Sequence, residues 1–215
     1  MSTFVYGILW ILCRVLAILL FRYKVIGSQH IPVKGGMVFA ANHASYADIP
    51  ILGCGVRRRL YYLGRSNLFP NPVLNRILRS LGWIPLRPSR VDRKAFGYAV
   101  ELLKAGKSVV IFPEGSRTLN GQLQGGKPGI GLIVADAHCP VVPVYIQGTF
   151  DVLPIGAKWI RCRPVRVIFG EPIDFTQELQ MYQGKDLYQY INRKVMARIA
   201  GLSRMGQSAN SDSLT

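Results

Sequence analysis

A histidine and a carboxylate lie five residues apart, where an apolar segment gives way to polar residues. The segment Met37 to Ala41 is β-rich, and Asn42, His43 and Asp48 follow it. A neutral histidine held by a carboxylate is a general base that removes the proton of a hydroxyl. On one continuous helix, side chains five residues apart point about 140° away from each other. The pair therefore forms only if His43 lies in a turn and Asp48 in the first helical turn.

The same residues also have a structural interpretation. Ser45 followed by Asp48 matches a capping box, in which Ser45 is the N-cap and Asp48 stabilises the helix start. An isolated histidine is commonly a polar residue of a turn. A helix N-terminus beside His43 would favour the neutral imidazole, and its backbone N–H groups could stabilise an oxyanion. Both interpretations of Asp48 stay open.

Two further segments bring charged residues to the ends of predicted strands. Val110 to Phe112 continues into a turn that carries Glu114 and Arg117, and Gly82 to Leu86 continues into Arg87. Guanidinium groups bind phosphate in a bidentate manner, so the two arginines are candidates for one phosphate clamp. A solvated turn with a surface ion pair is the alternative for Glu114 and Arg117.

The segments that must position these residues predict an α/β domain with a mixed sheet flanked by helices. Predicted strands are 37–41, 60–63, 83–86, 108–112, 141–146 and 165–169. Predicted helices are 45–53, 72–81, 93–105, 128–137 and 187–202. We expect one domain over residues 23–202, with its chemistry in loops at strand ends. The polar composition of residues 203–215 predicts a disordered tail.

Residues 1–22 predict a hydrophobic membrane-anchoring helix. Thr3 to Phe21 is apolar except for Arg14, and as a helix it approaches the roughly 30 Å thickness of a hydrocarbon core. Arg14 leaves open whether the helix spans the bilayer or lies at its surface. The basic residues Arg22 and Lys24 predict that the domain lies on the cytoplasmic face of a membrane, either a bacterial inner membrane or an equivalent organelle membrane.

Composition narrows the classes of partner. The net charge of +16 arises from 27 Lys and Arg against 11 Asp and Glu, which predicts anionic partners. The basic residues are scattered among apolar segments without a zinc-finger or RNA-binding signature, so we expect no nucleic acid partner. The 4 cysteines lack metal-ligand spacing, which predicts free thiols and no metal site.

Four segments, taken together, resemble the ordered motifs of the glycerolipid acyltransferase family. They are Asn42-His43 with Asp48, Gly82 to Arg87, Phe112 to Arg117, and Val141 to Val144. The likeness is strongest to the 1-acyl-glycerol-3-phosphate acyltransferase branch and runs from about residue 30 to residue 154. Each motif alone is weak, but four in this order are specific.

The resemblance implies a role for each site residue. His43 would be the catalytic base, and Asp48 would orient it. Ser116 stands where threonine is more usual, and Lys127 belongs to a Lys-x-Gly element that follows the third motif. Pro143, in the fourth motif, would help to shape the acyl-carrier side. The implied substrate-binding residues are Arg87, Glu114, Gly115, Ser116, Arg117, Lys127 and Pro143.

The resemblance also implies the reaction. A fatty acyl group would pass from acyl-CoA or acyl carrier protein to the sn-2 hydroxyl of 1-acyl-glycerol-3-phosphate, which yields phosphatidic acid. No cofactor is implied, and the partners would be the lysophospholipid acceptor, the acyl donor and the bilayer. Two alternatives stay open: an acyltransferase for another lysolipid, such as an acylated amino-acid lipid, and a noncatalytic basic protein that binds anionic membranes.

Overall fold

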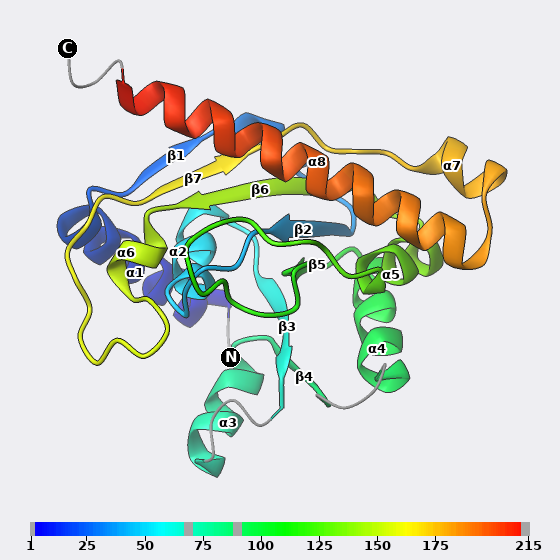
Figure 1. Cartoon of the computed structure of the whole chain (residues 1–215). Coiled ribbons are helices and arrows are strands. Elements are labelled where there is room, and N and C mark those ends of the chain that lie inside the picture. The colour runs from blue at the N-terminus through cyan, green and yellow to red at the C-terminus, as the bar shows by residue number, and fades with distance from the viewer. Residues whose placement is uncertain (1–2, 67–70, 88–91, 212–215) are drawn as a thin grey trace.

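A mixed β-sheet forms the centre of the molecule (Figure 1). The computed structural model describes residues 3–66, 71–87 and 92–211. Within them the sheet has seven strands in the order β1-β7-β6-β2-β5-β3-β4. The strands are β1 (Lys24–Ile26), β2 (Met37–Ala41), β3 (Leu60–Arg65), β4 (Trp83–Leu86), β5 (Ser108–Ile111), β6 (Val141–Gln147) and β7 (Arg166–Phe169). The predicted α/β class with a mixed sheet is confirmed.

Strand direction brings the candidate residues to one edge. β2 pairs in parallel with both β5 and β6, and β3 pairs in parallel with β5 and β4. Only the pairing of β6 with β7 is antiparallel among the described strands. The carboxyl ends of β2, β3, β4 and β5 therefore meet at one edge, where loops of open α/β sheets form binding sites.

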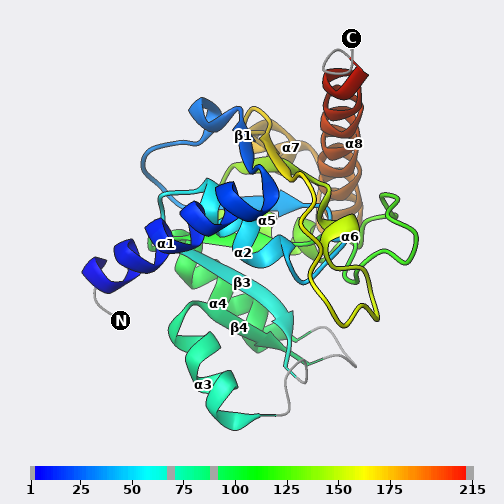
Figure 2. The same cartoon turned by 90° about the vertical axis from the view of Figure 1, so that its left-hand side faces the viewer.

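Helices cover both faces of the sheet (Figures 1 and 2). The alternation of β2 sends Val38 and Ala40 into one apolar layer, and Phe39 into the other. The first layer includes residues of α4 (Arg93–Lys104), α5 (Gly129–Ala137) and α8 (Gly184–Ser211), and the second includes residues of α1 (Thr3–Phe21) and α2 (Asp48–Gly55). The remaining helices are η1 (Ser28–His30), α3 (Pro72–Ser80), α6 (Thr149–Val152) and α7 (Thr176–Met181).

The predicted elements all form, and the differences lie at their ends. β3 continues two residues past the predicted Leu63, and the helix predicted over 45–53 begins only at Asp48. α8 continues through residues 203–211, which belong to the segment for which the sequence predicts disorder. Gly206 is buried there, and a Cβ at this position would lie 3.0 Å from the Ile168 side chain, so the glycine lets α8 approach β7. Residues 1–2 and 212–215 lie outside the described residues.

α1 forms over the predicted anchor segment and packs on the C-terminal end of α2. The Trp10 Nε1–H donates to the carbonyls of Gly53 and Val56, and the Arg14 guanidinium donates to the Cys54 carbonyl at 2.6 Å. Arg14 thus places its charge at the carbonyl end of a helix, where a cation is favourable. Within the described residues, no helix combines the length and apolar content that crossing a membrane requires.

Candidate active site

The turn after β2 is fixed by an asparagine side chain. The Asn42 Nδ2–H donates to the Ile146 carbonyl at 3.0 Å, and Asn42 Oδ1 accepts from the Ile146 N–H at 2.7 Å. The amide group thereby bonds to both backbone groups of one residue of β6. Because these are backbone-like bonds made by a side chain, the main chain is free to leave the sheet at the next residue. That residue is His43.

His43 and Asp48 form the pair that their spacing predicts. The distance from His43 Nδ1 to Asp48 Oδ2 is 2.8 Å, and the side chains are 14% and 0% exposed. An ionised carboxylate only accepts hydrogen bonds, so Nδ1 carries the proton. The imidazole Nε2 then has a free lone pair, which a general base requires. The geometry fits the predicted catalytic roles, which stay predictions.

Asp48 makes the contacts that both of its candidate roles require. Its Oδ2 also accepts from the N–H groups of Ala44 at 2.7 Å and Ser45 at 2.8 Å. The carboxylate therefore organises the turn as a capping residue would, and orients the imidazole with the same oxygen. The two interpretations that the sequence left open are not exclusive.

Ser45 differs from its predicted N-cap position. Ala47 is the residue that precedes α2, without a side-chain cap. Ser45 Oγ accepts from the Ala47 N–H at 3.0 Å and donates to the Leu153 carbonyl at 2.8 Å. The Ala44, Ser45 and Ala47 amides all donate within this turn. The expectation that amides of this turn are free for an oxyanion is wrong for these three groups, because Asp48 and Ser45 already satisfy them.

The loop after β5 holds His43 from the other side. The Phe112 ring stacks on the imidazole with 4.0 Å between centroids and 18° between planes. The Thr118 N–H donates to the His43 carbonyl at 2.9 Å. The His43 N–H donates to Glu114 Oε1 at 2.7 Å. The ring and its peptide group are therefore both fixed before any substrate binds.

Glu114 is buried and hydrogen-bonded to the backbone of two loops, and its predicted contact with substrate stays a prediction. The residue is 3% exposed, and its Oε2 accepts from the Gln124 N–H at 2.8 Å. Burial raises the pKa of its carboxyl, while the two backbone donors act in the opposite direction. Glu114 does not line the cavity beside His43. The carboxylate accepts from both partly buried N–H groups, one with each oxygen, so it joins the histidine turn to the loop that leads to α5.

A cavity of about 660 Å³ opens beside the imidazole. Its lining divides into an apolar and a charged set. The apolar residues are Ile49, Leu63, Trp83, Leu86, Phe96, Ile111, Phe112, Ile130, Ile133 and Ile155. The charged residues are Arg65, Arg87, Asp92, Arg117 and Lys127. His43 therefore belongs to a cavity that offers both an apolar wall and several cations.

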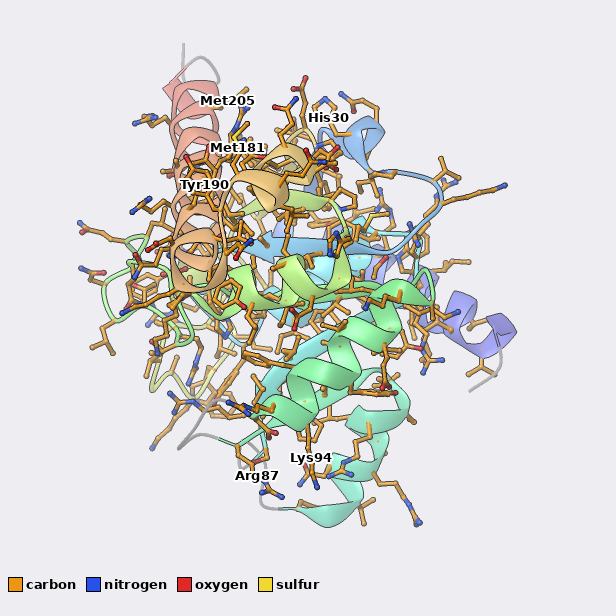
Figure 3. The ribbon with its side chains drawn as sticks, turned by 90° about the vertical axis from the view of Figure 1, so that its right-hand side faces the viewer. His30, Arg87, Lys94, Met181, Tyr190 and Met205 are labelled. Atoms are coloured by element: carbon orange, nitrogen blue, oxygen red, sulfur yellow. The ribbon has the colours of Figure 1, made fainter. Side chains whose placement is uncertain are left out.

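Predicted binding residues come together around this cavity. Arg87, Gly115, Ser116, Arg117 and Lys127 all line it, although three different segments of the chain contribute them. The Arg117 guanidinium lies 3.5 Å from the centroid of the Tyr46 ring, which directs it to the histidine turn. Figure 3 shows Arg87 on the same side of the molecule as the start of α4, and its N–H donates to Asp92 Oδ2 at 3.1 Å.

Position 115 requires glycine for two reasons, its backbone conformation and the close approach of the Lys127 side chain. Its φ of +71° lies in the left-handed region, and a Cβ there would lie 2.9 Å from Lys127 Cδ and 3.0 Å from Nζ. The Lys127 side chain thus crosses directly over the glycine. The backbone N–H of Lys127 donates to the Pro113 carbonyl at 2.8 Å. A side chain at position 115 would displace the lysine from the cavity.

Pro143 and Arg65 are the clearest differences from the sequence expectation. Pro143 is buried inside β6 beside Ala40, its ring lies near Gly170, and it does not line the cavity. Its predicted contribution to the acyl-carrier side is therefore not a contact with this cavity.

Sequence reasoning missed Arg65, which is the last residue of β3. Arg65 pairs with Leu86 and so lies next to Arg87. The available signal was the basic residue after strand 60–63.

Comparisons with known proteins agree with this arrangement. The protein-family model described as Acyltransferase matches residues 22–147, more than half of the chain. The chloroplastic 1-acyl-sn-glycerol-3-phosphate acyltransferase of Brassica napus is 33% identical over 63% of this chain and 40% of that protein. The lyso-ornithine lipid O-acyltransferase of Pseudomonas aeruginosa is 28% identical over 67% of this chain and 55% of that protein. The chain thus spans about half the length of these relatives.

A solved structure extends the likeness to the fold. The crystal structure of the 1-acyl-sn-glycerophosphate acyltransferase PlsC from Thermotoga maritima matches with a TM-score of 0.68 and 28% sequence identity. The match covers 84% of this chain and 72% of that one. The predicted resemblance to the 1-acyl-glycerol-3-phosphate acyltransferase branch is confirmed.

Proposed function

Because this chain belongs to the acyltransferase family, we propose that it transfers a fatty acyl group from a thioester to the sn-2 hydroxyl of 1-acyl-glycerol-3-phosphate, forming phosphatidic acid. The observation that carries the proposal is the His43–Asp48 pair, whose histidine lines a cavity with an apolar wall and several cations. An acyl chain fits the apolar wall, a phosphate fits the cations, and the base belongs where the two substrates meet.

The proposed reaction is a direct transfer in a complex of both substrates. Nε2 of His43 takes the proton of the acceptor hydroxyl while the oxygen of that hydroxyl attacks the carbonyl carbon of the thioester. The C–S bond then breaks, and the imidazolium returns its proton to the sulfur of the leaving thiol. Asp48 stabilises the positive imidazolium through Nδ1 at 2.8 Å. Ser45 is engaged with Leu153 and Ala47, which supports transfer without an acyl-serine intermediate.

The acceptor phosphate is proposed to lie among four cations. Arg65 is the last residue of β3, and Arg87 follows its strand partner Leu86. Arg117 and Lys127 come from the segment between β5 and α5. Charge-assisted hydrogen bonds to phosphate are about twice as strong as neutral ones, which gives a phosphorylated acceptor an advantage over an uncharged one. The donor is proposed to be acyl-CoA or acyl carrier protein, and the apolar wall supports a fatty chain with either carrier.

The proposed site of action is the cytoplasmic face of a membrane, with α1 lying in the bilayer surface. α1 exposes many large apolar side chains, including Ile11 at 58% and Leu19 at 74%. Exposed apolar area of this extent on a helix that also packs on the domain supports an interfacial position. In that position the helix would keep the cavity close to lipid substrates.

A second acceptor class is favoured by one observation. The Pseudomonas relative is named for a lyso-ornithine lipid, and its similarity covers as much of this chain as the similarity of the plant relative. Such a lipid has no glycerol phosphate, so the cations around the cavity would meet a carboxylate instead. The two candidates share the same base and the same thioester chemistry, and they differ in the acceptor alone.

A matrix of substrates tests the proposal. The purified protein is incubated with each acceptor (1-acyl-glycerol-3-phosphate, lyso-ornithine lipid or monoacylglycerol) and each donor (acyl-CoA or acyl carrier protein), and products are identified by mass. We expect phosphatidic acid as the main product and none from the His43→Ala variant. Transfer only to lyso-ornithine lipid would replace the first candidate with the second, and no transfer to any acceptor would contradict both.

A further inference from the structure

The loop between α6 and β7 exposes two large apolar side chains that are flanked by basic ones. Trp159 is 81% exposed and Ile160 is 63% exposed, while Lys158, Arg161 and Arg163 beside them are also exposed. A tryptophan with this exposure is unusual in a soluble surface loop, because its large apolar area gains from burial. Tryptophan flanked by lysine and arginine is the combination that favours a membrane–water interface.

This loop is tied to the end of α1. The Val165 N–H donates to the Phe21 carbonyl at 2.9 Å, and the Arg161 N–H donates to the Val152 carbonyl at 2.9 Å. Leu19, two residues before the end of α1, is 74% exposed. Figures 1 and 2 show α1 and the loop at the same end of the molecule, both toward the viewer in Figure 2. Their apolar side chains can therefore meet one surface together.

The loop also reaches the cavity. Ile155, near the start of the loop, is 40% exposed and lines the cavity that contains His43. Ser45, in the histidine turn, donates to the carbonyl of Leu153 just before it. A partner that holds the loop would thus lie next to the opening through which a lipid must pass.

We propose that residues 155–163 form a second membrane contact, which inserts Trp159 and Ile160 into an anionic bilayer surface and holds the cavity against it. Lys158, Arg161 and Arg163 would contact lipid phosphates, where each cation attracts an anionic surface. The inference rests on the proposed position of α1 in a membrane. An acidic carrier protein would also meet a basic loop, but it would not account for the exposed apolar side chains of the loop and of α1 at the same end of the molecule.

The chain supplies its own probes for a test. Cys162 in the loop and Cys13 in α1 are exposed, whereas Cys54 and Cys139 are buried. Burial raises the pKa of Cys54 to about 11 and that of Cys139 to about 12, so both thiols are poorly reactive at pH 7.5. A polarity-sensitive fluorophore on the Cys13→Ser variant therefore reports the loop, and one on the Cys162→Ser variant reports α1.

Each labelled protein is titrated with phosphatidylglycerol vesicles and with phosphatidylcholine vesicles. We expect the fluorescence of both labels to shift to that of an apolar environment, with the loop label responding more strongly to the anionic vesicles. The variant Trp159→Ser/Ile160→Ser should weaken vesicle binding by about tenfold or more. Met181→Ser is the matched control, because Met181 is 71% exposed on α7, at the other end of the molecule in Figure 1, and binding should not change.

Changing Lys158, Arg161 and Arg163 to glutamine should lower binding to anionic vesicles by about fivefold for each cation removed. A response of the α1 label without a response of the loop label would overturn the inference while leaving the anchor proposal intact. A loop response to acidic carrier protein but not to vesicles would also overturn it. If neither label changes its fluorescence, both membrane contacts are rejected. Acyl transfer to a short-chain soluble acceptor would then show whether the enzymatic proposal survives.

Discussion

The histidine turn and the cationic rim of the cavity are built in opposite ways. In the turn, residues 42–48, one buried carboxylate oxygen holds the imidazole and two backbone amides, and the loop after β5 fixes the imidazole ring and peptide. The rim consists of Arg65, Arg87, Arg117 and Lys127, of which all but Arg117 are exposed. The group proposed to move a proton is fixed in advance, whereas the groups proposed to bind the acceptor are long and adaptable.

This difference assigns different energetic tasks to the two regions. A preorganised base contributes to the transition state because no reorganisation is needed when the proton moves. Exposed cations cost little while unpaired and gain their contacts only when an anion arrives. Substitutions in the turn should therefore affect every substrate, whereas substitutions in the rim should affect substrates according to their charge.

The largest expected effect is that of His43→Ala. General-base catalysis typically contributes 10²–10⁴-fold, so turnover should fall by about that factor for every acceptor. The melting temperature should change little, because the imidazole is partly exposed and its removal leaves the sheet intact. Steady-state kinetics and thermal melting on the same preparation measure both. His138→Asn is the matched control, since His138 is an exposed residue at the end of α5, and near-normal turnover is expected.

Asp48→Asn should follow, with losses of both activity and stability. The amide oxygen can accept from the same three donors but lacks the charge that stabilises the imidazolium, so turnover should fall by about 10²-fold or more. The other carboxylate oxygen, Oδ1, is buried and has no hydrogen-bond partner among the described residues, so an NH₂ group there would be unsatisfied. The unfolding free energy should therefore fall by about 1–3 kcal/mol. A stability loss with full activity would reduce Asp48 to a capping residue.

How much the sequence predicted differs between the same two regions. The spacing of His43 and Asp48, and the apolar strand before them, predicted both the pairing and its place at a strand end. Local sequence carries that information because only six residues, 42–47, separate the strand from the helix, and Asp48 bonds to the turn that they form. The structural role of Glu114 was not predicted, because its partners His43 and Gln124 lie 71 and 10 residues away. Arg65 was missed for the same reason: its neighbour Arg87 is adjacent only through strand pairing.

Arg117→Ala tests whether the cationic rim distinguishes charged from uncharged acceptors. If Arg117 contacts the acceptor phosphate, its loss should cost about 1.5–3 kcal/mol, or roughly 10- to 150-fold, with 1-acyl-glycerol-3-phosphate. Monoacylglycerol should be a poor acceptor for the intact protein and should lose little more in the variant. The comparison is a double-mutant cycle with the substrate as one partner, measured as the ratio of kcat/KM values. Equal loss with both acceptors would mean that Arg117 supports the histidine turn through its contact with the Tyr46 ring and does not bind the acceptor phosphate.

Glu114→Gln gives the smallest expected effect, and it tests the connection between the two regions. The amide can accept only one of the two N–H groups now bound at 2.7 and 2.8 Å, so one partly buried donor would lose its partner. We expect the unfolding free energy to fall by about 1–3 kcal/mol near neutral pH, with a moderate loss of turnover that is equal for charged and uncharged acceptors. Denaturant unfolding and the two-acceptor assay measure these effects.

The pH dependence of the Glu114→Gln effect identifies its origin. Because burial raises the pKa of Glu114 in the folded state, protonation favours folding, and this contribution to stability is present below the ordinary glutamate pKa. It is lost as the pH rises from that value through the raised folded pKa, and glutamine cannot show this loss. Wild-type stability should therefore fall more steeply with rising pH across this interval than that of the variant. If the stabilities of the wild type and the variant change in parallel with pH, the backbone donors lower the pKa of Glu114 as much as burial raises it. The carboxylate would then hold the histidine turn without cost from its own desolvation, and the variant's lower stability would come from the unpaired amide alone.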